Sequence, residues 1–168
     1  IDRSRTPVPR HHIEADEVSK EIARLELAIA LSIEQLEAIR TRFVDDGMDH
    51  QSILEAHEMM LRDPSLFHEA ARHIESEHTN AEWAVNRVIT RIRGLFDREN
   101  DAYLRERGGD VHFVGERILR NLVGEISEID EFTQLNEDAV VVAHDLSPAD
   151  TALLSRKNIA AFVTEVGG

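Results

Sequence analysis

The chain has 168 residues, of which 42% are hydrophobic and 31% are charged, so it can bury the core of one domain or of two small subdomains. Its formal net charge of −14 argues against nucleic acid as a partner, because an acidic surface repels a phosphate backbone. The absence of cysteine excludes disulfides, thiolate nucleophiles and zinc–thiolate sites. No apolar run approaches the roughly 20 residues that cross a bilayer, so no membrane association is expected.

The first dozen residues, IDRSRTPVPRHH, contain two prolines and no helical period, and they predict a linker or strand end over 1–12. A long helix is predicted next, over about 14–43, because apolar residues recur every three or four positions, as on one buried helix face. These residues are Val18, Ile22, Leu25, Ile29, Ile33, Leu36, Ile39 and Phe43. The sequence DDG at 45–47 is expected to end this helix.

A second helix is predicted over about 49–62, and RDPSLF then starts a short one that reaches about residue 77. There Asp63 can cap the new helix while Pro64 takes its first position, where a missing N–H costs nothing. This short helix extends the second arm of the first helical hairpin.

A second hairpin is predicted from the capping box of Thr79 and Glu82 onward. Its first helix is expected to carry the apolar positions Val85, Ile89, Ile92, Phe96 and Tyr103. The pair Gly108-Gly109 is predicted to break or bend it, and Asp110 to cap a last helix that Gly124 stops.

The character of the sequence changes after residue 136. AVVVA at 139–143 is typical of a buried strand, and NIAAFVT at 158–164 is predicted to be a second strand. The helix predicted between them has Ser147 as its cap, Pro148 next and Asp150 at the third helical position. Strand, helix, strand normally gives two parallel strands joined by a crossover. One such unit cannot make a stable sheet alone, so this α/β part is predicted to be incomplete.

The predicted fold is therefore mainly α, with a helical subdomain of two packed helical hairpins and an incomplete α/β subdomain. The predicted boundaries are 1–12 for the linker, 13–124 for the helical subdomain and 125–168 for the α/β part.

No constellation able to run a reaction is recognisable in the chain. HEMML at 57–61 begins like the zinc protease motif H-E-x-x-H, but Leu61 stands where the second histidine belongs. His68, His73 and His78 are five apart, which turns each about 140° from the last on a helix, so they cannot act as ligands on one face. We expect no catalytic residue, no metal site and no cofactor within these residues.

The second helix carries a stripe beside its core-facing arc. The arc is predicted to contain Ile53, His57, Met60 and Leu61, and the stripe consists of Ser52, Ala56, Met59 and Asp63, at i, i+4, i+7 and i+11. Small residues, a methionine and an acid suit the close approach of a partner. The alternative is that the stripe packs inside the bundle, and spacing alone favours that alternative.

Ser147 has a predicted role as a helix cap. Because a hydroxyl has one donor and two acceptor sites, we expect it to keep a donor free after it caps the helix. The N-terminus of that helix would also favour a phosphoryl group nearby.

Four further segments of the sequence belong together: EAHEMMLRDP (55–64), AYLRERGGDVHFVGERILRNLVG (102–124), AHDLSPADTALL (143–154) and FVTEVGG (162–168). Taken together, they resemble Enzyme I of the bacterial sugar phosphotransferase system, the phosphoenolpyruvate–protein phosphotransferase. Their order and spacing fit the amino-terminal domain of that family, over essentially the whole chain beyond the linker.

The resemblance implies a role in phosphoryl transfer. In the family, the Gly-Gly pair is followed by Thr-Ser-His, whose histidine takes phosphate from phosphoenolpyruvate and passes it to the carrier HPr. The resemblance therefore places the active histidine beyond Gly168, where this chain ends. We expect a cytoplasmic piece that binds HPr but does not catalyse. Phosphoenolpyruvate and magnesium would belong to a carboxy-terminal domain of the same parent chain.

The resemblance also implies which residues meet HPr. In the family HPr docks on the second helix, the short helix after it and the helices that follow, and this favours the stripe as a binding face. Matching positions are Met59, Met60, Asp63 and Leu66, with Ser52 and Ala56 beside them, His112 where many members have a basic residue, and Ser147 next to the phosphohistidine. Pro64 and Ser65 replace acids that are common in the family, which weakens the expected electrostatic contact.

Two other interpretations remain open at the level of sequence. One is the phosphohistidine domain of another phosphoenolpyruvate-utilising enzyme, such as pyruvate phosphate dikinase or phosphoenolpyruvate synthase, although GERILRNLVG at 115–124 favours Enzyme I. The other is a helical interaction module without phosphotransfer. The sequence does not distinguish sugar uptake from nitrogen regulation. It leaves the oligomeric state open, and the resemblance favours a monomer because it assigns the family's main dimer contacts to the carboxy-terminal half.

Overall fold

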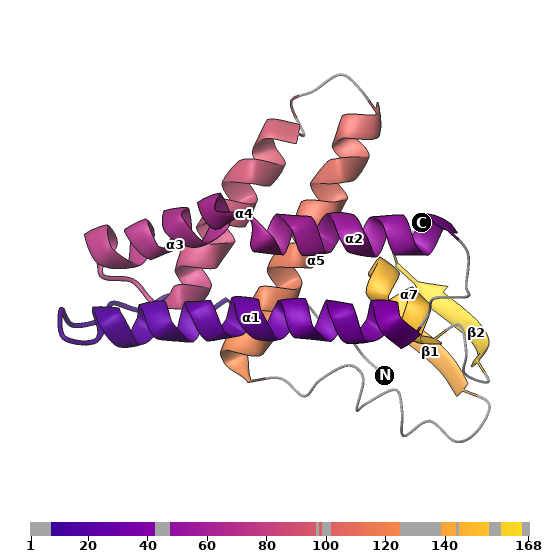
Figure 1. The fold of residues 1–168 in the computed structure, drawn as a ribbon, viewed down its shortest axis with the longest axis horizontal. Helices are drawn as coiled ribbons and strands as arrows, with labels where there is room; N and C mark the ends of the chain where they lie inside the picture. The colour runs from indigo at the N-terminus through magenta and orange to yellow at the C-terminus, as the bar shows by residue number, and fades with distance from the viewer. Residues whose placement is uncertain are drawn as a thin grey trace.

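The computed structural model describes residues 8–42, 48–96, 98, 102–124, 139–143, 145–154 and 159–165. The helices in chain order are α1 (Val18–Arg42), α2 (Met48–Arg62), α3 (Pro64–Glu77), α4 (Ala81–Phe96) and α5 (Ala102–Val123). They are followed by strand β1 (Ala139–Ala143), helix α7 (Pro148–Leu154) and strand β2 (Ile159–Thr164) (Figure 1).

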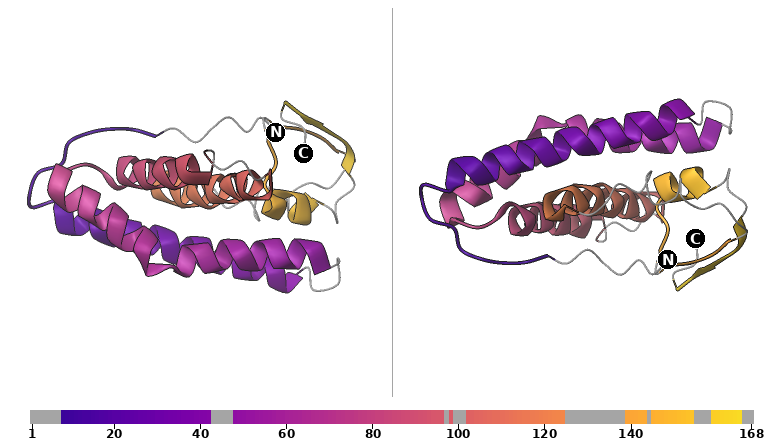
Figure 2. Two further views of the ribbon diagram at one scale, coloured as in Figure 1. Left: turned by 90° about the horizontal axis from the view of Figure 1, so that it is seen from above. Right: turned by 90° about the horizontal axis from the view of Figure 1, so that it is seen from below.

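The helices form two layers. Helices α1, α2 and α3 lie in one layer, and α4 and α5 lie in the other, as the two views of Figure 2 show. In Figure 1 the α4–α5 pair crosses α1 and α2 at a steep angle. The prediction of two packed helical hairpins with a small α/β part is confirmed.

The predicted apolar stripe of α1 faces the interior. Leu25, Leu36 and Ile39 on this stripe are almost completely buried. Ser32 lies among them, donating to the Ala28 carbonyl at 2.7 Å and accepting from Asn121 Nδ2 at 2.9 Å. A polar residue is tolerated there because both of its bonding roles are filled. The predictions for Phe43 and for the DDG stop at 45–47 lie outside the described residues.

The predicted break at Gly108-Gly109 is wrong, because α5 runs through both glycines from Ala102 to Val123. Each glycine costs a helix about 1 kcal/mol relative to alanine. The face that follows, with Val111, Val114 and Ile118, is buried, and burial of each large apolar side chain is worth about 1.5–3 kcal/mol. Asp110 therefore lies inside a helix and is not its cap.

Helices α4 and α5 approach each other closely at Gly115. A Cβ atom at this position would lie 2.7 Å from Ile89 Cγ1 of α4, closer than carbon atoms can come without a shift. The absence of a side chain therefore permits the short separation of the two helices.

The predicted cap of α4 is also wrong, because the helix begins at Ala81 and the cap position directly before it is Asn80, whose carbonyl accepts from the Ala84 N–H at 3.2 Å. Thr79 instead forms an antiparallel bridge with His12. The first free N–H of the helix, that of Ala81, donates to Glu21 Oε2 of α1 at 2.9 Å. A carboxylate from 60 residues upstream thus acts at a helix start where the local pattern indicated a threonine.

The described part of the predicted linker is tied to the helices. Asn80 donates from Nδ2 to the Pro9 carbonyl at 2.9 Å and accepts from the His11 N–H at 3.1 Å. The Ile13 N–H donates to the His78 carbonyl at 2.9 Å, and the Ile13 side chain is buried. These bonds hold the incoming chain along the α3–α4 connection.

The two strands pair in parallel, as predicted, with Val141 opposite Phe162. Along β1, Val141 and Ala143 are buried while Val140 and Val142 are about half exposed, which is the alternation of a sheet with one covered face. Helix α7 packs against α1 and α2, so the α/β part rests on the first helical hairpin.

An ionic cluster of two buried glutamates and the partly buried Arg24 joins α1, α4 and the end of α5. Arg24 donates to both carboxylate oxygens of Glu21, at 2.6 and 2.8 Å, to Glu82 Oε1 at 2.6 Å and to the Leu122 carbonyl at 3.0 Å. Glu82 also accepts from Asn80 Nδ2 at 2.8 Å. Burial alone would raise the pKa of Glu82, but its backbone hydrogen bond, Arg24 and Asn80 hold that pKa below its ordinary value.

We predict that Glu82→Gln lowers the free energy of unfolding by about 3 kcal/mol, because Arg24 loses one of its two carboxylate partners in the cluster. Since the folded-state pKa of Glu82 is lowered, its stabilising effect is present at neutral pH and is lost as the pH falls below about 4.5. Urea denaturation at pH 7 and pH 3.5 measures both effects.

Glu26→Gln is the matched control, because Glu26 is an exposed glutamate on α1, the helix that carries Arg24. It should change stability by no more than about 0.5 kcal/mol. Equal losses of stability in the two variants at pH 7 would contradict the importance of the cluster.

Candidate functional site

The predicted stripe on α2 is open to solvent. Met59 is 73% exposed, Ser52 and Asp63 are exposed, and Ala56 is half-buried. The alternative, that these residues pack inside the bundle, is contradicted by the exposure of Met59. We call Ser52, Ala56, Met59 and Asp63 the α2 strip.

One edge of the α2 strip is bordered by ion pairs to α1. Arg40 lies 3.2 Å from Glu55 and 3.4 Å from Glu58, and Arg62 donates to Glu58 at 3.0 Å and also pairs with Glu37. Single exposed pairs contribute little to stability, but a connected set restricts the rotation of α2 against α1. Of this set, the sequence pattern could have revealed only the i,i+4 pair of Glu58 and Arg62.

The face of α2 opposite the solvent is fixed by a histidine. His57 is 3% exposed, and its Nε2 lies 3.1 Å from Asp110 Oδ1 of α5. Because an ionised carboxylate only accepts hydrogen bonds, Nε2 carries the proton and donates it. The prediction that His57 belongs to the core arc is confirmed, as it is for Leu61, and Leu54 joins them although the sequence analysis did not include it.

Asp63 combines a structural role with a surface charge. Its Oδ1 accepts from the Ser65 N–H at 2.8 Å and from the Ser65 hydroxyl at 2.6 Å, so it caps α3 as predicted. These bonds, from the Ser65 hydroxyl first and its N–H second, lower the pKa of Asp63. The carboxylate is therefore charged at neutral pH and exposed at the end of the α2 strip.

Two of the predicted contact residues belong more to the core than to the surface. Leu66 is 7% exposed and lies in the core cluster, so it offers little area to a partner. Met60 is half-buried and packs against the same cluster. Both support the α2 strip from below.

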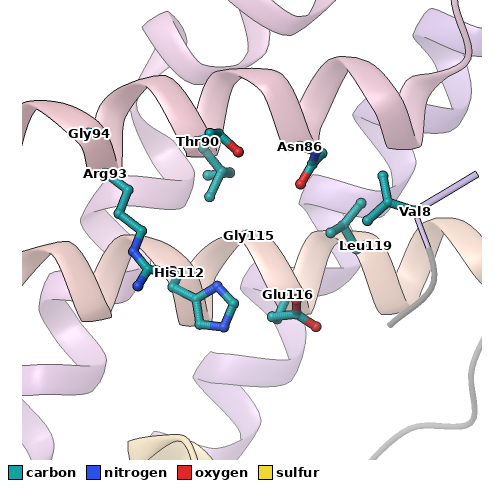
Figure 3. A pocket seen from close by; sticks show the side chains of 10 residues that line it. Val8, Asn86, Thr90, Arg93, Gly94, His112, Gly115, Glu116 and Leu119 are labelled. Carbon is teal, nitrogen blue, oxygen red and sulfur yellow. The ribbon is translucent and has the colours of Figure 1, made fainter. Parts of the chain in front are cut away.

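His112 lies in a different feature of the molecule. Two residues along α5 correspond to a rotation of about 200°, so His112 points away from Asp110 and α2. It lines a cavity of about 430 Å³ between α4 and α5, together with Asn86, Arg93 and Glu116 (Figure 3). A partner that covers the α2 strip and His112 together must reach around the edge of the bundle.

Ser147 caps α7, as predicted, but its hydroxyl has no free donor. Its Oγ accepts from the Asp150 N–H at 3.1 Å and donates to Asp150 Oδ2 at 2.8 Å. The same carboxylate oxygen accepts from the Ser147 N–H at 3.0 Å, which completes a reciprocal capping box. The expectation of a free hydroxyl donor is therefore wrong, because Asp150 lies close enough to take it.

The segment expected to lead to the phosphohistidine follows β2. The last residue that the structure describes is Glu165, whose N–H donates to the Ala143 carbonyl at 3.3 Å. The Gly-Gly pair that ends at Gly168 lies outside the described residues. The position of an active histidine beyond Gly168 therefore stays a prediction.

Within the described residues, no three His, Asp or Glu side chains lie close enough together to hold a metal ion. None of the described helices is long and apolar enough to cross a membrane.

Comparison with known families places the chain in a class. A family model of the N-terminal part of phosphoenolpyruvate-utilising enzymes matches residues 2–107, and one of their mobile domain matches residues 135–168. The first match covers more than half of the chain, so the chain belongs to the family of phosphoenolpyruvate-utilising enzymes.

Within this family, the chain is similar to phosphoenolpyruvate-protein phosphotransferases. The phosphoenolpyruvate-protein phosphotransferase of Enterococcus faecalis is 37% identical over 155 residues, which cover 91% of this chain and 27% of the relative. That of Geobacillus stearothermophilus is 36% identical over 153 residues, which cover 90% of this chain and 26% of the relative. The chain spans about a quarter of the length of these curated relatives.

Solved structures agree with this assignment. The NMR solution structure of an Enzyme I protein superimposes with a TM-score of 0.82 at 34% identity, over 98% of this chain and 66% of the other. The N-terminal domain of Enzyme 1 – Nitrogen gives a TM-score of 0.70 at 24% identity, over 99% of this chain and 68% of the other, and shows the likeness of fold.

We predict that Ser147→Ala destabilises the protein by about 1 kcal/mol, because α7 loses its cap and Asp150 loses a hydrogen-bond donor. Ser19→Ala, at an exposed serine near the start of α1, should change stability by less than about 0.5 kcal/mol. Thermal denaturation of both variants measures the difference. Equal stability of Ser147→Ala and the unaltered protein would contradict the capping role.

Proposed function

We propose that this chain is the HPr-docking part of a cytoplasmic phosphoenolpyruvate–protein phosphotransferase. The observation that carries the proposal is the open α2 strip, with the exposed Met59 at its centre and the charged Asp63 at its end. The parent enzyme would pass phosphate from phosphoenolpyruvate to HPr through a histidine that follows Gly168. Magnesium and phosphoenolpyruvate would bind a carboxy-terminal domain of that parent.

The chemistry of the α2 strip suits a basic carrier protein. A methionine is flexible and polarisable, so it can fill an apolar hollow on a partner whose shape is not its exact complement. Asp63 keeps its charge through its bonds to Ser65, and both of those bonds use Oδ1, so Oδ2 can accept from a lysine or arginine of the partner. The net charge of −14 would add long-range attraction for a basic surface.

The frame around the α2 strip favours docking without rearrangement. The ion pairs of Arg40 and Arg62 hold one edge of α2, and the His57–Asp110 bond holds its buried face. A surface that is already ordered loses less conformational entropy when a partner binds, and affinity improves accordingly.

The α/β part stands where it can present a phosphoryl group to a carrier on α2. Helix α7 packs against α2, the helix that carries the α2 strip. We propose that Ser147 and Asp150 act there by holding α7 in place. A direct bond from Ser147 to a phosphohistidine would require the hydroxyl to turn away from Asp150.

We predict that Met59→Ala weakens HPr binding by roughly tenfold, because it removes the apolar anchor without disturbing the core. Titration of isotope-labelled HPr with the protein, followed by NMR shifts, measures the dissociation constant. Arg72→Ala, which truncates a long exposed side chain on the outer face of α3, is the control and should leave the constant within about twofold. No shift on HPr at high micromolar protein would refute docking altogether.

A second variant tests the electrostatic part of the proposal. Asp63→Asn keeps an oxygen that can cap α3 but removes the charge, so we expect binding to weaken roughly three- to tenfold and to depend less on salt. Glu75→Gln removes one exposed negative charge from α3, away from the α2 strip, and should have little effect. Equal effects of the two variants would mean that only overall charge matters.

A further inference from the structure

Helix α1 has a second apolar face, directed away from the bundle. Leu27 is 60% exposed and Leu31 is 36% exposed, and Ala23 and Ala30 beside them are exposed as well. At 100° per residue these side chains fall on one stripe of the helix, roughly opposite the core residues Leu25, Leu36 and Ile39. We call Lys20, Ala23, Leu27, Ala30, Leu31 and Glu34 the α1 outer face.

The two ends of the α1 outer face carry opposite charges. Lys20 lies seven residues before Leu27 and Glu34 seven residues after it, which puts all three on one side of the helix. Among the described residues neither charged side chain has an ion-pair partner, although Arg24, Glu37 and Arg40 on the same helix are all paired. Lys20 also lies in the first turn of α1, where the helix dipole disfavours a positive charge by about 0.3–1 kcal/mol.

We propose that the α1 outer face associates with the same face of a second copy of this chain, as an antiparallel helix pair with its twofold axis at Leu27. In that arrangement Leu27 of one copy contacts Leu27 of the other. A residue that lies a given number of positions before Leu27 in one copy faces the residue the same number of positions after Leu27 in the other copy. Lys20 of each copy then faces Glu34 of the other. Ala23 faces Leu31, a small side chain against a large one.

The charges select this arrangement over the alternative. A parallel pair in register would place Lys20 against Lys20 and Glu34 against Glu34, and like charges in contact oppose association. Only the antiparallel pair satisfies both charges of both copies. An unrelated partner would not require the equal spacing of Lys20 and Glu34 about Leu27, so the symmetry of the α1 outer face favours a second copy.

The association should be weak. One helix pair buries less area than the roughly 1,200–2,000 Å² of a stable interface, so a dissociation constant on the order of 0.1–1 mM is expected, and the monomer prevails in dilute solution. Each copy carries a charge of −14, and at about 0.15 M salt the Debye length of about 8 Å removes most of the long-range repulsion between copies.

A charge exchange tests the pairing directly. Lys20→Glu alone and Glu34→Lys alone each create two like-charge contacts per dimer, so sedimentation equilibrium at up to about 1 mM should show association weakened about fivefold or more. An equal mixture of the two variants should recover to within about threefold of the unaltered protein, because in the mixed pair the acidic residues 20 and 34 of one copy face the basic residues 34 and 20 of the other, so both contacts join opposite charges. An equal mixture of Arg72→Glu and Glu75→Lys, with the same charges on the outer face of α3, should associate like the unaltered protein throughout.

Chemical cross-linking supplies an independent measurement. Within one copy, Lys20 and Glu34 are about 21 Å apart along α1, so a zero-length carbodiimide bond between them can form only between copies. We expect this cross-link in the dimer fraction of the unaltered protein. Lys20→Arg should lose the cross-link but keep the association, because arginine retains the charge and does not couple.

Three results would overturn the proposal. They are a monomer at 1 mM with no Lys20–Glu34 cross-link, a mixture of the charge variants that associates no better than either alone, and association that survives Leu27→Glu. Circular dichroism of each variant confirms that the helices are intact, so a loss of association is distinguished from a loss of fold.

Discussion

The structure depends on one arginine placed between two buried carboxylates. Arg24 of α1 bonds to Glu21 on its own helix, to Glu82 at the start of α4 and to the last turn of α5 at Leu122. Glu21 in turn accepts the N–H of Ala81, the first residue of α4. The two helical layers are thus joined at one end by a charged cluster whose members satisfy each other. An apolar contact there would be less directional, because only hydrogen bonds constrain the orientation of both groups.

Further polar contacts hold α2, the helix of the candidate docking surface, against α1 and α5. Arg40 and Arg62 connect α1 to α2 along one edge, and His57 connects α2 to α5 through Asp110. Helix α2 therefore cannot rotate freely, and the α2 strip keeps Met59 outward while Leu54 and Leu61 remain in the core. The charged side chains of α1 differ in whether they have ion-pair partners. Arg24, Glu37 and Arg40 of α1 are paired within the chain, whereas Lys20 and Glu34 on the α1 outer face have no ion-pair partner among the described residues. This difference is the basis for proposing a second copy as their partner.

In the proposed phosphotransferase, the relation between the two parts of the fold would be functional as well as structural. A phosphoryl carrier that docks on α2 must come near the α/β part, and α7 is held against α1 and α2. The capping box of Ser147 and Asp150 fixes the first turn of α7, and packing against α1 and α2 positions the helix. In the proposed phosphotransferase, the carrier would dock on α2, and α7, which packs against α2, would hold the α/β part beside it for presentation of the phosphoryl group.

The sequence by itself determined the first three helices, the parallel strand pair and the buried face of α1, because apolar periodicity records which side of an element is buried. It also determined the caps formed by Asp63 and Ser147, whose partners lie within three residues. The exposure of Met59 was decided by the tertiary structure, since spacing alone favoured packing of the α2 strip inside the bundle. Only the tertiary structure decided that α5 continues through Gly108 and Gly109, that Glu21 caps α4, that His112 faces a separate cavity, and that Asp150 uses the hydroxyl donor of Ser147. The first three outcomes depend on neighbours distant along the chain, where packing outweighs local preference. The fourth depends on a side-chain rotamer, which residue spacing does not specify.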